Sequence, residues 1–361
     1  MKRFGSFLWV SVVLVTGTAG VGLLAPAAVA STGDGAGQRS DDRSVPGSEP
    51  AALLLLERAE RAAYTIPYSG VRYLATWCPR GTTSAIVEVA HVPGVGTTIL
   101  RRHTAADPNG QLPVPDGAAD QPVTAPSAHG PATAGLVARN FQVVVSGLDK
   151  VAGRTAAVVE ARRPGTGSVA ARMWVDTATA LVLRLEVFDS RGAAVRASSF
   201  IAVTQGRPSP AVPQQGTLAV PAGLDRLRAA GWTVPATLPH GLRLYDVRTM
   251  DSPTGPIVHA SYSDGLSTVS VFAQHGRLDT GALSGYGEVR YGDVSVYVYD
   301  GTPRRVMWAA NGMVYTILTD APEEMIQSVL ATLPRDTGDG GVLARVGRGM
   351  TRVGSWFNPF G

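Results

Sequence analysis

Residues Arg172–Phe200 read RMWVDTATALVLRLEVFDSRGAAVRASSF, and this stretch predicts the fold most directly. Aliphatic side chains alternate with other types over residues 181–188, and a period of two is typical of a half-buried strand. Residues 189–192, Asp-Ser-Arg-Gly, have the composition of a tight turn, because glycine adopts positive φ without strain. We therefore expect three short antiparallel strands in the wall of a curved sheet. The aliphatic face would consist of Leu181, Leu183, Leu185 and Val187.

Residues 1–30 have the features of a cleaved export signal. Lys2 and Arg3 precede an apolar stretch, and Ala28-Val29-Ala30 matches an A-x-A cleavage site. Threonine and glycine interrupt the apolar stretch, which favours cleavage over a retained membrane anchor. We expect an exported protein that is periplasmic or otherwise extracytoplasmic and associated with the cell envelope.

Charge and composition exclude some classes of protein. Loss of Lys2 and Arg3 with the signal would lower the formal charge from +4 to +2, which is too little for a nucleic-acid-binding protein. The wealth of arginine, alanine, glycine and valine is typical of a high-GC bacterium. Cys78 is the single cysteine, so no disulfide can form within the chain. We expect it to be buried, with a disulfide to another chain as the alternative.

Composition and periodicity also predict the domain organisation. Gln205–Gly216 is rich in proline and glutamine, as interdomain linkers are. The predicted segments are a signal peptide (1–30), a disordered segment (31–50), a first domain (51–204), a linker (205–222), a smaller second domain (223–334) and a basic amphipathic tail (335–361).

Both domains are predicted to be α+β, with more strands than helices. In the first, we expect a helix at 51–64, strands at 69–77, 83–91 and 96–103, a loop at 107–131, and strands at 136–146 and 155–162 around a turn at 147–150. In the second, we expect a helix at 224–230, a hairpin at 258–272, a strand at 289–299, a strand pair at 306–318 turning at Asn311-Gly312, and a helix at 321–330.

The sequence contains no motif that predicts catalysis, a metal or a cofactor. The six histidines have no metal-binding spacing, and neither a G-x-S-x-G elbow nor a Gly-Lys phosphate loop is present. Ser263-Asp264 has the composition of a hairpin turn. We expect a binding protein with no catalytic residue, although carboxylates distant in sequence leave a secreted hydrolase as an alternative.

Four segments, in this order, resemble the RseB/MucB family of exported negative regulators of σE-type envelope-stress responses. They are YTIPYSGVRYL from Tyr64, FQVVVSGLDKVAGRTAAVVEARR from Phe141, MWVDTATALVLRLEVFDSRGAAVRASSF from Met173, and a final region with Gly231-Trp232, the L-P-x-G corner at 238–241 and YSDGL at 262–266.

The resemblance implies an antiparallel β half-barrel of LolA type, closed by helices, and a smaller C-terminal α+β domain. It also implies that the protein binds the exported part of a membrane-anchored anti-sigma factor, shields it from proteolysis, and senses a lipid or lipoprotein signal. An actinobacterial source would lack lipopolysaccharide, so another envelope lipid or lipoprotein would have to serve. A lipid or lipoprotein carrier with the same fold is the main alternative.

The aliphatic face suits an apolar cavity for acyl chains. The candidate lining residues are Met173, Trp174, Val175, Leu183, Leu185, Val187 and Phe200, with Met173 and Val175, or else Trp174, on the inner face. A dry core packed against the 51–64 helix would use the same residues. The partner-binding candidates, from the YSDGL resemblance, are Tyr262, Asp264 and Leu266.

The tail is basic and amphipathic. Apolar residues recur at helical spacing over residues 342–357, which favours either a membrane-surface helix or a disordered tail. The candidate membrane-contact residues are Arg345, Arg348, Arg352, Trp356 and Phe357.

Overall fold

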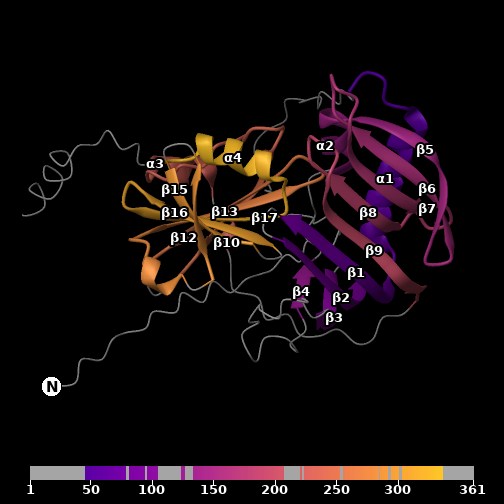
Figure 1. The fold of residues 1–361 in the computed structure, drawn as a ribbon, viewed down its shortest axis with the longest axis horizontal. Coiled ribbons are helices and arrows are strands. Elements are labelled where there is room, and N and C mark those ends of the chain that lie inside the picture. Colours follow the sequence, from indigo (N-terminus) through magenta and orange to yellow (C-terminus); the bar gives the residue numbers. More distant parts are fainter. Residues whose placement is uncertain are drawn as a thin grey trace, which may run out of the picture.

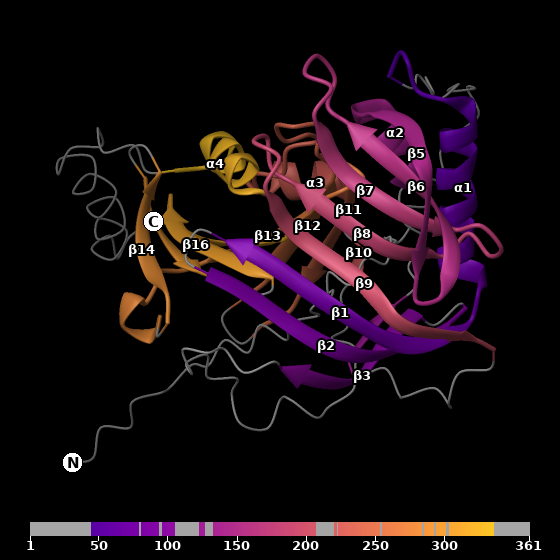
Figure 2. The same cartoon turned by 45° about the vertical axis from the view of Figure 1, so that its right-hand side comes forward.

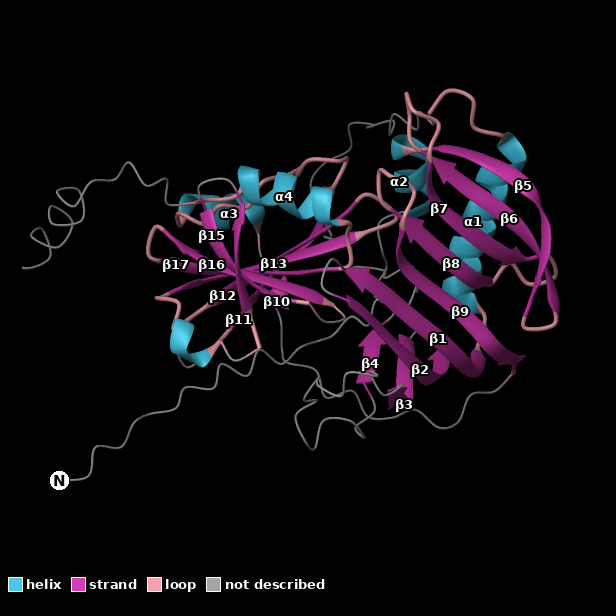
Figure 3. Ribbon diagram, in the orientation of Figure 1, coloured by secondary structure: helices cyan, strands magenta, loops and turns pink. Residues whose placement is uncertain are grey.

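The computed structural model describes residues 45–78, 81–93, 96–104, 123–126, 133–206, 220–221, 223–252, 255–283, 285–291, 294–300 and 303–335. The described chain forms two open antiparallel β-sheets accompanied by helices (Figures 1 and 3). The expectation of mostly antiparallel sheets with few helices is confirmed.

The first sheet has nine strands in the order β4-β3-β2-β1-β9-β8-β7-β6-β5, so β1 and β9 lie at its centre. The strands are β1 (Tyr68–Cys78), β2 (Gly81–Val92), β3 (Gly96–Thr104), β4 (Val123–Pro126), β5 (Gln142–Val151), β6 (Arg154–Arg162), β7 (Val169–Asp176), β8 (Val182–Phe188) and β9 (Ala194–Gln205). The three strands predicted from residues 172–200 are therefore present. The short strand β4 lies within the stretch predicted as a loop.

Helix α1 (Pro50–Thr65) lies against one face of this sheet (Figure 2). Pro50 occupies the start of the helix, where the missing N–H costs nothing. Its buried residues recur three or four positions apart and form a single stripe toward the sheet, which explains why this segment is helical. That stripe consists of Ala52, Leu56, Ala59 and Ala62.

The turn between β8 and β9 has the predicted chemistry. One carboxylate oxygen of Asp189 accepts hydrogen bonds from the backbone amides of Arg191 (3.0 Å) and Ala193 (2.8 Å). Gly192 has a φ of 84°, which an L-residue rarely adopts.

Two predictions between residues 136 and 155 are wrong. Residues 136–140 belong to helix α2 (Thr133–Asn140), which precedes β5. The β5–β6 turn is formed by Ala152 and Gly153, both with positive φ, as a two-residue hairpin turn requires. Gly147 lies instead at a register shift within β5, so the glycine marks a bulge and not the turn.

The second sheet has eight strands in the order β10-β11-β12-β13-β17-β16-β15-β14. They are β10 (Val220–Pro221), β11 (Arg243–Met250), β12 (Ile257–Ser263), β13 (Thr268–His275), β14 (Gly287–Tyr291), β15 (Val294–Tyr299), β16 (Arg304–Ala310) and β17 (Met313–Thr319). A short 3-10 helix, η1 (Thr280–Ala282), follows β13. The predicted hairpins at 258–272 and 306–318 are confirmed.

Two further predictions for this half need correction. The single strand expected at 289–299 is a hairpin of β14 and β15, with Tyr291 opposite Val294. The sequence feature that indicates this hairpin is the Gly-Asp pair at residues 292–293, a dipeptide typical of turns. In addition, β10 falls within the predicted linker and pairs with β11.

Each sheet has its own buried apolar cluster. The first cluster lies between α1 and the sheet, and the second joins its sheet to helices α3 (Leu224–Ala229) and α4 (Glu323–Thr332). The predicted helices at 224–230 and 321–330 correspond to these two helices. Among the described residues, no helix is long and apolar enough to cross a membrane.

Candidate functional site

The residues predicted to line a cavity all lie in the buried apolar cluster of the first sheet. Met173 lies opposite Leu185 across β7 and β8, so the two side chains share one face. Leu56 and Ala59 of α1 belong to the same cluster, and the side chains pack as a core against this helix. None of the seven is more than 7% exposed: Met173, Trp174, Val175, Leu183, Leu185, Val187 and Phe200.

The register places Trp174 on the opposite face of the sheet from Met173. Trp174 lies opposite Arg184, whose guanidinium carbon is 4.5 Å from the centroid of the indole ring. The indole N–H donates to a carboxylate oxygen of Asp149 at 2.9 Å. Of the two predicted alternatives for the inner face, the structure therefore has Met173 and not Trp174.

The W-V-D-x-x-T pattern, which carried part of the family resemblance, builds the β7–β8 turn. Asp176 accepts hydrogen bonds from Arg154 at 2.7 and 3.1 Å and another from the hydroxyl of Thr179. Burial by itself raises the pKa of Asp176, but these hydrogen bonds outweigh it and hold the pKa below its usual value. The motif is therefore structural.

Aromatic and basic side chains occupy the inner face where β1 meets β9. The Phe200 ring packs edge-to-face on Tyr68, with centroids 5.5 Å apart. The Arg72 guanidinium carbon lies 4.2 Å from the centroid of the Phe200 ring. Burial lowers the pKa of Arg72 from its usual value. The interior is thus apolar under β7 and β8 and carries a buried cationic side chain under β1.

The three residues predicted to contact a partner lie inside the molecule, near the turn between β12 and β13. Tyr262 is 1% exposed, and its hydroxyl donates to the carbonyl of Pro235 at 3.0 Å. Asp264 and Leu266 are also buried, and Leu266 belongs to the apolar cluster of the first sheet. The YSDGL turn therefore joins the two sheets, and its contact with a partner stays a prediction.

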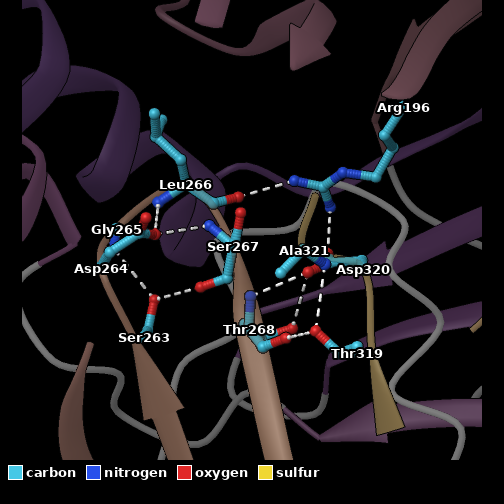
Figure 4. Close-up of polar contacts among 10 residues, drawn as sticks. All are labelled: Arg196, Ser263, Asp264, Gly265, Leu266, Ser267, Thr268, Thr319, Asp320 and Ala321. Carbon is cyan, nitrogen blue, oxygen red and sulfur yellow. Dashed lines mark hydrogen bonds and ion pairs between the residues drawn. The ribbon is translucent and has the colours of Figure 1, made fainter. Parts of the chain in front are cut away.

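The carboxylate of Asp264 organises this turn (Figure 4). One oxygen accepts hydrogen bonds from the backbone amides of Leu266 (2.8 Å) and Ser267 (2.7 Å). Burial raises the pKa of Asp264 to about 6, although the two amide hydrogen bonds favour the charged form. The nearby carboxylate of Asp320 raises this pKa further.

Two glycines of the motifs contact the end of α2. A Cβ on Gly265 would lie 2.7 Å from the backbone nitrogen of Val137, and one on Gly241 would lie 2.5 Å from the side-chain oxygen of Asn140. Both glycines have positive φ, at 97° and 75°. The Asn140 amide donates to the carbonyls of Asp264 (2.9 Å) and Gly241 (3.3 Å). The L-P-x-G and YSDGL turns thus hold the second sheet against the first.

A buried ion pair reinforces this junction. Arg196 of β9 pairs with Asp320, which follows β17, and a second guanidinium nitrogen donates to the carbonyl of Leu266 at 2.6 Å. The other oxygen of Asp320 accepts a hydrogen bond from the backbone amide of Thr268 at 2.8 Å. Figure 4 shows Arg196 reaching from its strand toward both partners.

Sequence reasoning missed Arg196, Asp320 and Asn140. A signal existed for Arg196, because it shares the inward parity of Ser198 and Phe200 along β9, and an inward arginine in a strand is unusual. No signal existed for Asn140, or for the pairing of Asp320 with Arg196, because these contacts join residues more than a hundred positions apart.

One Ser–His contact could suggest nucleophilic chemistry. The Ser261 hydroxyl and the His259 Nε2 are 3.1 Å apart, and the His259 ring stacks on Phe272 with centroids 4.2 Å apart. Burial, followed by the charge of Arg248, lowers the pKa of His259 to about 4. A general base must accept a proton during catalysis, and this environment disfavours the charged ring. The contact is therefore explained by packing.

Other predicted sites lie elsewhere. Within the described residues, no cluster of three or more His, Cys, Asp or Glu side chains could hold a metal ion. The signal peptide and the side chain of Cys78 lie outside the described residues. The tail candidates Arg345, Arg348, Arg352, Trp356 and Phe357 also lie outside them.

A family model described as the MucB/RseB N-terminal domain matches residues 119–219 of this chain. The match spans strands β5–β9, the part of the first sheet that contains the W-V-D-x-x-T turn and Arg196. It confirms the resemblance for the two segments that begin at Phe141 and Met173. No curated protein matches the chain significantly.

Several solved structures are similar at low identity. A crystal structure of MucB is 20% identical, with 80% of this chain and 99% of that chain covered and a TM-score of 0.44. A complex of Pseudomonas aeruginosa MucA and MucB is 19% identical, with 77% and 96% covered and a TM-score of 0.41. A LolA superfamily protein from Nitrosomonas europaea is 9% identical, with 76% and 96% covered and a TM-score of 0.19.

Proposed function

We propose that this chain is a member of the MucB/RseB family, and that it is an exported regulator that binds the extracytoplasmic part of a membrane-anchored anti-sigma factor. The match over residues 119–219 is the observation that carries this proposal. The sequence features of residues 1–30 support export. The role is binding: the bound segment of the anti-sigma factor would be protected from proteolysis.

We also propose that the protein responds to an envelope lipid or lipoprotein through the first sheet. The inner face of β7 and β8 is aliphatic, and α1 covers it. An acyl chain would have to enter between α1 and this face, replacing contacts of Leu56 and Ala59 with contacts of its own. Such a ligand can change partner binding only if it binds the opened arrangement more tightly than the closed one.

Capture from an envelope extract tests both parts. Mature residues 31–361 are immobilised, and bound proteins and lipids are identified by mass spectrometry. The expected result is a single-span membrane protein with an exported segment, which is released when envelope lipid is added. Abundant lipid or lipoprotein with no such membrane protein would instead establish the carrier of LolA type.

A substitution in the covered face separates the two parts. Leu183→Asp places a charge among the aliphatic side chains under β8 and disfavours any acyl chain there. Leu148→Asp, at a position of β5 that is 71% exposed, is the matched control for an added negative charge. If the folded Leu183 variant still captured the membrane protein but lipid no longer released it, the lipid site would be located. Release as in the parent would contradict that location.

A further inference from the structure

The side chain of Arg196 leaves β9 on the inner face of the first sheet. Its guanidinium binds residues of the second half of the molecule. On β9, Arg196 lies opposite Thr76 of β1 and Val187 of β8, so its strand position belongs to the covered face. Ser198 and Phe200 follow at the same parity and are both buried. The side chain is therefore attached to the strand whose inner residues pack in the first apolar cluster.

The guanidinium joins two separate elements of the second half. One nitrogen pairs with Asp320 at the end of β17, and another donates to the Leu266 carbonyl in the β12–β13 turn. The two charged side chains are 7% and 6% exposed. Asp320 also accepts a hydrogen bond from the backbone amide of Thr268, the first residue of β13. Arg196 therefore contacts both the β12–β13 turn and the end of β17.

This contact specifies one arrangement of the two sheets. A buried ion pair adds little net stability because both charges lose hydration, but it penalises every arrangement that leaves one charge buried alone. Arginine suits the role because its planar fork serves two acceptors at once, whereas a lysine ammonium acts as a point charge. The Leu266 side chain adds an apolar contact, since it belongs to the cluster of the first sheet.

We propose that Arg196 couples the two sheets, so that a displacement of the inner face of β9 releases the β12–β13 turn and changes the position of the second sheet. The biological role of this coupling rests on the proposed function: a ligand that enters beneath the first sheet would change the position of the second sheet through Arg196. The coupling itself does not depend on which ligand or partner binds.

The test measures the arrangement of the two sheets directly. Spin labels are placed at Ala178→Cys, in the β7–β8 turn, and Ser295→Cys, on β15, in a Cys78→Ser background; residues 178 and 295 are exposed. Double electron–electron resonance then gives the distance distribution between the sheets. Arg196→Met is expected to broaden this distribution. It is also expected to increase amide exchange of Leu266, Ser267 and Thr268 by about tenfold or more.

Three further variants make the result specific. Arg184→Met removes an arginine ion pair from the outer face of β8 and is expected to leave the distribution unchanged. Asp320→Asn removes the partner charge and is expected to broaden it as Arg196→Met does, with no additional effect in the double variant. Arg196→Lys, which keeps the charge but not the fork, is expected to give an intermediate width.

A narrow, parent-like distribution in folded Arg196→Met or Asp320→Asn would overturn the inference. Equal broadening in Arg184→Met would also overturn it, because any lost ion pair would then suffice. If Arg196→Met did not fold, the Asp320→Asn result would decide. Capture of the membrane protein by the parent chain tests the proposed function separately, so the two can fail independently.

Discussion

Asp264 is buried at the β12–β13 turn, where two backbone amides hold its carboxylate and Asp320 lies nearby. Burial raises the pKa of Asp264 in the folded protein to about 6, from the ordinary value of 3.8 that applies to the unfolded chain. Between about pH 4 and pH 6 the folded state therefore holds a proton that the unfolded state has released. The free energy of unfolding should fall as pH rises through this window and stay lowered above it.

Asp264→Asn removes this titration and keeps the hydrogen-bond acceptor. The stability of the variant relative to the parent should increase by up to about 3 kcal/mol between pH 4 and pH 7. Urea unfolding at several pH values, followed by tryptophan fluorescence, measures the difference. Identical pH profiles for the parent and the variant would show that Asp264 does not titrate in this range.

Asp176 makes the opposite contribution at the β7–β8 turn, because its pKa is lowered by Arg154 and Thr179. Stability from this group is present at neutral pH and is lost as pH falls through the folded pKa. Asp176→Ala should lower the free energy of unfolding by about 2–4 kcal/mol, since it also leaves Arg154 without this partner. Asp225→Ala is the control: its ion pair with Arg228 is 3.8 Å long and Asp225 is fully exposed. An equal loss of unfolding free energy in both variants would contradict the stabilising role of the Asp176 ion pair.

For single residues, contacts between near neighbours in the sequence could be predicted, and contacts between distant residues could not. The turn at Asp189 was predictable because its acceptor and its donors lie within four residues. The face of Trp174 was not, because a register shift follows it on β7 and changes the pairing with β8. Burial of Asp264 depends on α2, which lies more than a hundred residues earlier.

The two halves of the molecule meet at the end of α2, which contacts the L-P-x-G and YSDGL turns of the second half. The sequence predicted the β12–β13 hairpin, because its turn residues and alternating strands are local signals. It did not predict α2, because residues 136–140 of this helix are predicted to be the start of a strand. Short apolar stretches are ambiguous between helix and strand, and here tertiary packing against Gly241 and Gly265 decides.

Gly265→Ala tests this packing of elements. A Cβ would lie 2.7 Å from Val137, and the φ of 97° strains any L-residue, so a loss of about 3 kcal/mol or more in the free energy of unfolding is expected. Gly312→Ala, in the β16–β17 turn, is the matched control, with a φ of 75° and open space around the added carbon. This control should lose only about 1 kcal/mol from backbone strain. A similar loss in both would mean that α2 does not press on the turn.

For the whole molecule, the sequence predicts two domains, at residues 51–204 and 223–334. This division can be tested by following unfolding with one tryptophan at a time. Trp174 reports on the first sheet and Trp308 on the second, where its ring stacks on Tyr315. Two domains should give two transitions that separate further in Arg196→Met. Coincident transitions in both proteins would indicate one cooperative unit.

Arg196 and the turns around α2 join the two sheets of this molecule. We propose that the molecule binds the exported segment of a membrane anti-sigma factor. The most direct measurement is isothermal titration of mature residues 31–361 with the exported segment of the membrane protein captured from the envelope. Saturable 1:1 binding, with a Kd of about 1 μM or tighter, is predicted. No binding heat at any temperature, with both components folded and soluble, would contradict the claim.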